Sequence, residues 1–189
     1  MKYVKILGLL AVAAAALMAF AGTASADNVS TTTGGAAATP TIHAVSEGHA
    51  TLHNPIDKIE CASTVEGTVT GHGAGQPVSG PINVLTFAPC TNSWHVTATN
   101  AGTLSVSATS GHNGTLTSNG ATVVSTRFGV ECRYATNNTK IGTVTGGSPA
   151  TLHIEAAIPF HGGSSFCGSG ATTWTGSYET TAPLFVNKS

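Results

Sequence analysis

Charged side chains are scarce in this sequence. Asp, Glu, Lys and Arg together make up 8% of its 189 residues, whereas an average globular domain contains roughly 25%. The seven Lys and Arg residues form no cluster, and nucleic acids and anionic membrane surfaces are bound through clustered basic side chains. We therefore expect neither of them as a partner, and we expect Thr, Ser, Asn and Gly to cover the surface.

Motifs that would mark an enzyme are absent as well. The chain has no G-x-S-x-G nucleophile motif, and no C-x2-C pair that could supply half of a tetrahedral zinc site. A glycosidase needs two carboxylates across a cleft, and no pattern pairs any of the eight Asp and Glu residues. We predict a protein that is not an enzyme and needs no cofactor. The alternative is a metal-dependent secreted hydrolase that uses His and Glu from adjacent strands.

The first 26 residues have the three parts of a secretory signal peptide. Lys2 and Lys5 precede an apolar run over residues 6–22, and Ala-Ser-Ala follows at residues 24–26. A retained membrane anchor is the alternative, because the run is about as long as the roughly 20 residues that span a bilayer. The polar stretch that starts at Asp27 favours cleavage after Ala26. The sequence thus predicts a secreted, extracellular product whose mature chain has no membrane anchor.

Residues 27–40 differ in composition from the rest of the chain. They contain no aromatic residue and one branched aliphatic residue, Val29, too little apolar surface to offset the entropy lost on ordering. We predict a flexible leader here, with a first edge strand as the alternative. Residues 41–189 are predicted to form a single domain.

After Pro40, apolar and polar residues alternate along the chain. Such alternation is typical of strands with one face in a core and one in water. It is regular in residues 152–160 and in residues 124–134, where Phe128 is expected to face inward with its apolar neighbours. Turn signals rich in Gly, Asn and Pro separate the runs. The predicted fold is all-β, a two-sheet sandwich or a barrel-like arrangement of antiparallel strands.

An even number of cysteines in an exported chain indicates disulfides. Free buried thiols are the alternative. The order [IV]-E-C, then GTVTG, then Cys, then Trp occurs twice, at about residues 59–99 and 130–178. This repetition predicts an internal duplication, unless it is a coincidence of low complexity. A duplication favours Cys61–Cys90 with Cys132–Cys167, although Cys61–Cys132 with Cys90–Cys167 would also preserve the symmetry.

Histidines and aromatic residues are the remaining candidates for binding. His43, His49 and His53 are metal-ligand candidates, but on a strand His49 and His53 would lie about 13 Å apart, so a metal would need His from neighbouring strands. Trp174 and Tyr178 share one strand face. If that face is outward, the two rings form a strip on which a carbohydrate or another apolar ligand could stack.

Three long, uncharged stretches have high β-propensity: TLSVSATSG, GTLTSNGATVVSTRFG and GTVTGG. Without charges, strand edges of this kind invite pairing with another chain. The alternative is that loops or the leader at residues 27–40 cover these edges. The function predicted first is therefore a secreted, non-enzymatic domain for binding or surface assembly, which pairs by its strand edges with another copy or another extracellular protein. A carbohydrate or small-ligand binding module is the alternative.

Overall fold

The structure is a computed structural model that describes residues 27–72 and 76–188. The predicted signal peptide, residues 1–26, lies outside the described residues. The described residues form two short 3-10 helices, η1 (Thr91–Ser93) and η2 (Ser165–Cys167). Neither has the length and apolar character that a membrane-spanning helix requires. The strands are β1 (Asn28–Ser30), β2 (Thr41–Ser46), β3 (Ala50–His53), β4 (Lys58–Thr68), β5 (Val78–Cys90), β6 (His95–Asn100), β7 (Thr103–Ala108), β8 (Asn113–Asn119), β9 (Thr122–Arg127), β10 (Val130–Ala135), β11 (Thr139–Thr145), β12 (Thr151–Ile158), β13 (Phe160–Gly163), β14 (Thr172–Thr180) and β15 (Phe185–Asn187).

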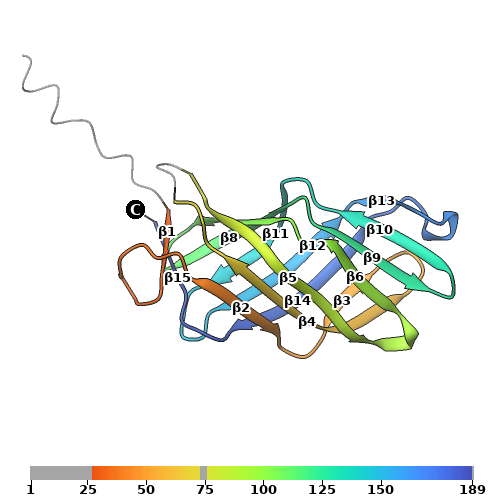
Figure 1. Cartoon of the computed structure of the whole chain (residues 1–189), viewed down its shortest axis with the longest axis horizontal. Helices are drawn as coiled ribbons and strands as arrows, with labels where there is room; N and C mark the ends of the chain where they lie inside the picture. Colours follow the sequence, from red (N-terminus) through yellow and green to blue (C-terminus); the bar gives the residue numbers. More distant parts are fainter. Residues whose placement is uncertain (1–26, 73–75, 189) are drawn as a thin grey trace, which may run out of the picture.

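Eight antiparallel strand positions close into a barrel. The order around it is β5, β7, β8, β11, β12, β14, then β2 and β3 together, then β4, which pairs back with β5. Because β2 and β3 both pair with β14 and with β4, they occupy one position (Figure 1). The prediction of an all-β fold is confirmed. Of the two predicted arrangements, a two-sheet sandwich and a barrel, the structure has the barrel.

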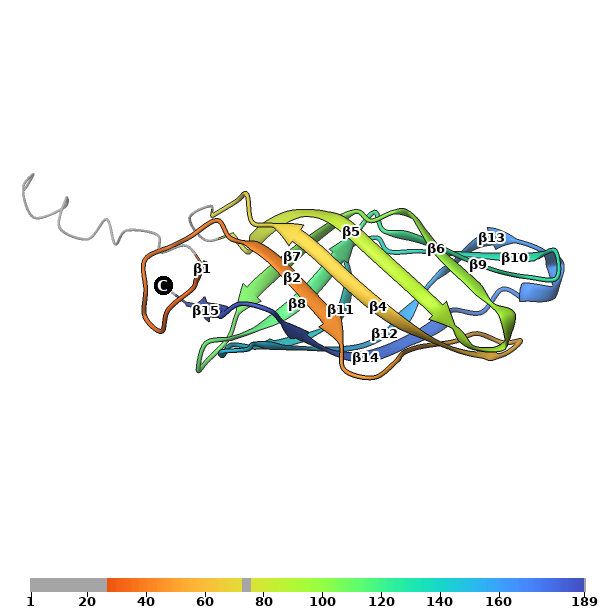
Figure 2. The ribbon, with the colours of Figure 1, turned by 60° about the horizontal axis from the view of Figure 1, so that its bottom comes forward.

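Further strands lie outside the barrel at its two ends (Figure 2). The first part of β5 pairs with β7, whereas Thr86 and Phe87 pair with β6. Strands β6, β9, β10 and β13 therefore continue the sheet beyond the barrel. The two-stranded sheet of β1 and β15 lies at the opposite end.

The barrel interior follows from the alternation in the sequence. In β12, Leu152, Ile154 and Ile158 are buried, while His153 and Glu155 between them are exposed. The run 124–134 does not form one strand, because Phe128 and Gly129 make a turn between β9 and β10. The inward prediction for Phe128 is therefore wrong: its side chain is 85% exposed.

Both copies of GTVTG begin where a strand is irregular. The register of β4 against β5 shifts between Glu66 and Gly67, and that of β11 against β8 shifts between Lys140 and Gly142. A Cβ at Gly142 would overlap the carbonyl oxygen of His153 on β12. Bulges and glycines bend strands so that a sheet can curve and close. The repeated pentapeptide thus marks two bends of the barrel wall.

The two predicted repeats are not folded in the same way. In the first, I-E-C and the start of GTVTG share the single strand β4; in the second, they lie on β10 and β11. The internal duplication stays a prediction about the origin of the sequence.

Both predicted disulfides are present: Cys61–Cys90 and Cys132–Cys167. The first joins residues that face each other on β4 and β5, and the second ties β10 to η2.

Part of the predicted leader is ordered as a strand. Residues Asn28–Ser30 pair with β15, and Val29 is 1% exposed opposite Val186. The Asp27 carboxylate accepts a hydrogen bond from the backbone N–H of Ala108 at 2.8 Å. Residues 28–30 thus form the edge strand that was the alternative to a flexible leader, and Val29 is buried at the barrel end.

Candidate functional site

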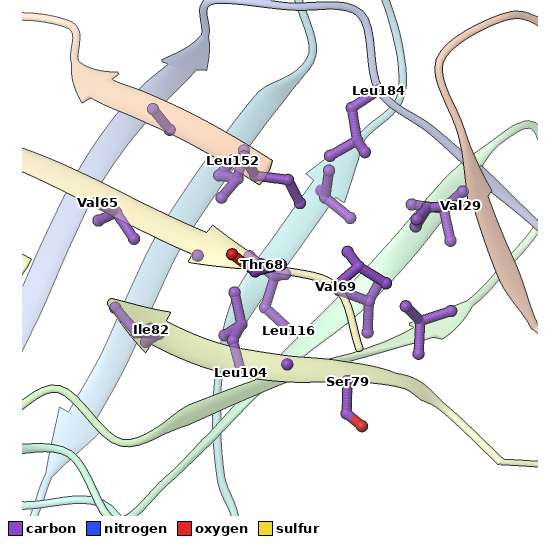
Figure 3. A pocket seen from close by; sticks show the side chains of 18 of the residues that line it. Val29, Val65, Thr68, Val69, Ser79, Ile82, Leu104, Leu116, Leu152 and Leu184 are labelled. Carbon is purple, nitrogen blue, oxygen red and sulfur yellow. The ribbon is translucent and has the colours of Figure 1, made fainter. Parts of the chain in front are cut away.

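An apolar cavity of about 60 Å³ lies inside the barrel, at the end near β1 and β15. Figure 3 shows aliphatic side chains from several strands converging on it. Thr68 and Ser79 are the polar side chains in its wall, and the Ser79 hydroxyl points away from the aliphatic cluster (Figure 3). The aliphatic wall includes Val29, Ile42, Val65, Val69, Leu116 and Leu152.

Three residues of the cavity wall have little or no side chain. Ala44, Gly67 and Gly80 belong to the wall, and none of them reaches far into the interior. One water molecule needs roughly 10–15 Å³ and two to four polar partners. The cavity has room for several water molecules but offers them few hydrogen bonds. Its chemistry favours an apolar occupant.

A second cavity of about 30 Å³ adjoins the first. Both are lined by Val65, Ile82, Leu104, Leu116 and Leu152. The second is also lined by Trp174 and Tyr178, whose rings meet edge to face with centroids 6.3 Å apart. Sequence analysis did not predict either cavity, because the space depends on how side chains from distant strands pack together.

Trp174 and Tyr178 share a face, as predicted, but that face is inward. Trp174 is 9% exposed and Tyr178 is 1% exposed. An outward stacking strip is therefore ruled out, since β14 turns both rings into the barrel. Any ligand that touches them has to lie inside.

The polar atoms of these two rings differ in their surroundings. The Tyr178 hydroxyl donates to Ser63 Oγ at 3.1 Å, and burial raises the pKa of Tyr178 above its ordinary value. Trp174 Nε1 is buried near that hydroxyl but makes no hydrogen bond of acceptable geometry. Trp174 Nε1 is therefore a hydrogen-bond donor without a partner, on a residue that lines the second cavity.

The histidine candidates do not converge. Among the described residues, no three His, Cys, Asp or Glu side chains are close enough to hold a metal ion. His43 Nδ1 lies 2.7 Å from Glu66 Oε1 on the neighbouring strand. His49 lies in the turn after β2, and His53 ends β3. The fold thus spreads the three residues along the barrel wall.

Two carboxylates do come together. Glu179 raises the pKa of Glu47, mainly through its negative charge and also through burial and a shared hydrogen bond. Neither side chain lines either cavity. The pair therefore lies apart from both of these cavities.

The predicted free edges are paired. The three uncharged stretches form β7, β8 with β9, and β11, and each of these strands has a neighbour on both sides. Their prediction as exposed edges is wrong, because the barrel closes and its extension covers them. In the large sheet, β13 (Phe160–Gly163) is an end strand with one neighbour, β10.

Two exposed phenylalanines lie in neighbouring segments: Phe128 in the turn between β9 and β10, and Phe166 in η2. Figure 2 shows β9 and β10 at one end of the molecule. Phe128 is 85% exposed and Phe166 is 78% exposed. The Arg127 guanidinium lies 4.9 Å from the Phe128 ring and 3.0 Å from Asp57 Oδ2. The Trp94 indole also donates to Asp57 at 3.0 Å, and this hydrogen bond is the main cause that lowers the pKa of Asp57. For Phe128 this exposed position replaces the inward one that the sequence pattern predicted.

Comparison with known proteins assigns this chain to no family. No known protein family, curated protein or solved structure matches this chain.

Proposed function

We propose that this protein is a secreted, non-enzymatic binding protein whose barrel holds a small apolar molecule. The observation that carries the proposal is the pair of adjoining cavities, whose walls are almost entirely aliphatic and aromatic. Eight-stranded barrels are just wide enough to be filled by side chains or to hold one small ligand. The two disulfides support an oxidising, extracellular setting.

The ligand class follows from the walls. Among the described residues, no charged side chain lines either cavity, and burial of an unpaired charge is strongly unfavourable. The occupant is therefore uncharged. Each buried methylene contributes about 0.8 kcal/mol, so a short alkyl chain is a suitable occupant for a space of this size.

A series of primary alcohols from butanol to decanol tests this function. Isothermal titration calorimetry should show affinity that rises roughly fourfold for each added methylene, until the chain is longer than the cavity. Ala44→Val fills part of the larger cavity and should weaken binding about fifteenfold, which corresponds to two displaced methylenes. Ala157→Val is the matched control, because Ala157 is exposed on β12. The proposal fails if no alcohol binds or if both variants weaken binding equally.

Surface assembly is a second candidate, and the two exposed phenylalanines favour it. A phenylalanine with φ of 48°, as at Phe128, is a conformational outlier, and strain of this kind often accompanies function. The charges nearby are mutually paired: Arg127–Asp57, Lys58–Glu60 and Arg133–Glu131. The end of the molecule with these two phenylalanines is therefore suited to contact an uncharged apolar surface, including the surface of a second copy of this chain.

Sedimentation equilibrium at increasing concentration tests assembly. We expect weak self-association, because two side chains bury far less than the roughly 800 Å² per partner of a stable interface. Phe128→Ser with Phe166→Ser should abolish it. Val45→Ser is the control, since Val45 is exposed on β2, away from this end. A wild-type protein that stays monomeric throughout would contradict this candidate.

A further inference from the structure

Among the described residues, the wall of the second cavity contains a polar group without a hydrogen-bond partner in the protein. Trp174 Nε1 is buried without a hydrogen-bond partner, although buried indole N–H groups usually have one. The Tyr178 hydroxyl, which donates to Ser63 Oγ, lies close to Trp174 Nε1 but not in the geometry of a hydrogen-bond acceptor for it. A buried donor without a partner is unfavourable, so this position calls for an acceptor from outside the chain.

The position of this donor relates it to the cavities. Trp174 lines the second cavity, and its ring is held by edge-to-face contacts with Phe87 and with Tyr178. The second cavity shares part of its wall with the larger aliphatic one. A single molecule could therefore place its hydrocarbon part in the larger space and a polar atom beside the indole.

We propose that the ligand carries one uncharged hydrogen-bond acceptor, a carbonyl or ether oxygen, and that Trp174 Nε1 donates to it. This inference rests on the proposed apolar-ligand function. A carboxylate is disfavoured, because no Lys, Arg or His of residues 27–72 and 76–188 lines either cavity to compensate its charge. The expected class is thus short alkyl ketones, aldehydes, esters and ethers.

A matched pair of ligands, 2-heptanone and 1-heptene, separates the acceptor from the hydrocarbon. Trp174→Phe removes the donor and keeps an aromatic ring. It should weaken ketone binding about five- to tenfold, the range of one hydrogen bond, and leave alkene binding unchanged or slightly tighter. Equal weakening of both ligands would overturn the acceptor role while leaving the cavity function intact. Failure of both ligands to bind the wild type would instead overturn the proposed function itself.

The indole N–H resonances of the wild-type protein give a readout that does not depend on a variant. The chain has two tryptophans, and Trp94 Nε1 already donates to Asp57. The ketone should shift the Trp174 N–H resonance downfield and leave that of Trp94 in place, and the alkene should produce no such downfield shift. A ketone that binds without shifting the Trp174 resonance more than the alkene does would overturn the inference.

Discussion

Removal of the Cys61–Cys90 disulfide will lower the free energy of unfolding by about 3.5 kcal/mol. The two cysteines are 29 residues apart in the sequence, and a cross-link over a loop of this length restricts the unfolded chain by roughly that amount. Cys61 is fully buried. Alanine is therefore the proper replacement at both positions, because serine at Cys61 would bury a hydroxyl group.

Urea denaturation of the Cys61→Ala, Cys90→Ala variant measures this loss. For a domain of this size the melting temperature should fall by roughly 7–14 °C. The Cys132→Ala, Cys167→Ala variant is the comparison, since its loop of 35 residues gives a similar entropic effect. A loss below about 1 kcal/mol in both variants would contradict this expectation and would show that the unfolded chain is already restricted without these cross-links.

Substitution of Gly142 by alanine will destabilise the barrel by about 1–3 kcal/mol or more, the range of an overpacked interior. The added Cβ would overlap the His153 carbonyl oxygen on β12, which is backbone and cannot rotate away. Strands β11 and β12 would have to separate, and hydrogen bonds of their ladder would lengthen. The bend of the barrel wall at the β11 bulge would then be lost together with these hydrogen bonds.

Gly170→Ala is the matched control for this substitution. A Cβ at Gly170 would meet Pro55 at an ordinary contact distance of 3.4 Å, and the residue is exposed. Thermal unfolding should leave this variant within about 0.5 kcal/mol of the wild type. If Gly142→Ala is equally well tolerated, the glycine of GTVTG is not required for the bend.

Local pattern predicted the strands, and repetition predicted the disulfides. Alternation identifies β12 residue by residue, because side chains on a strand point to opposite faces in turn. The same rule placed Trp174 and Tyr178 on one face but could not say which way that face points. Direction depends on which face packs against the rest of the chain, and that is decided by pairings such as β14 with β3.

The local sequence pattern does not predict that the strands close into a barrel. The pairing of β4 with β5 is visible in the repeat only as Cys61 and Cys90, and a sandwich would satisfy the same disulfide. Phe128 was placed inward because a two-residue turn with φ of 48° at phenylalanine has no usual sequence signal. The cavities depend on the summed volumes of residues far apart in the chain, so no single motif predicts them.

Xenon-pressurised crystals of the protein test the central claim, that the barrel interior accepts an apolar guest. Dry aliphatic cavities bind xenon without specific polar contacts. The account predicts xenon density inside the barrel, beside Val29, Leu116 and Leu152 in the larger cavity. A barrel interior without xenon, in crystals where surface positions are occupied, would contradict it.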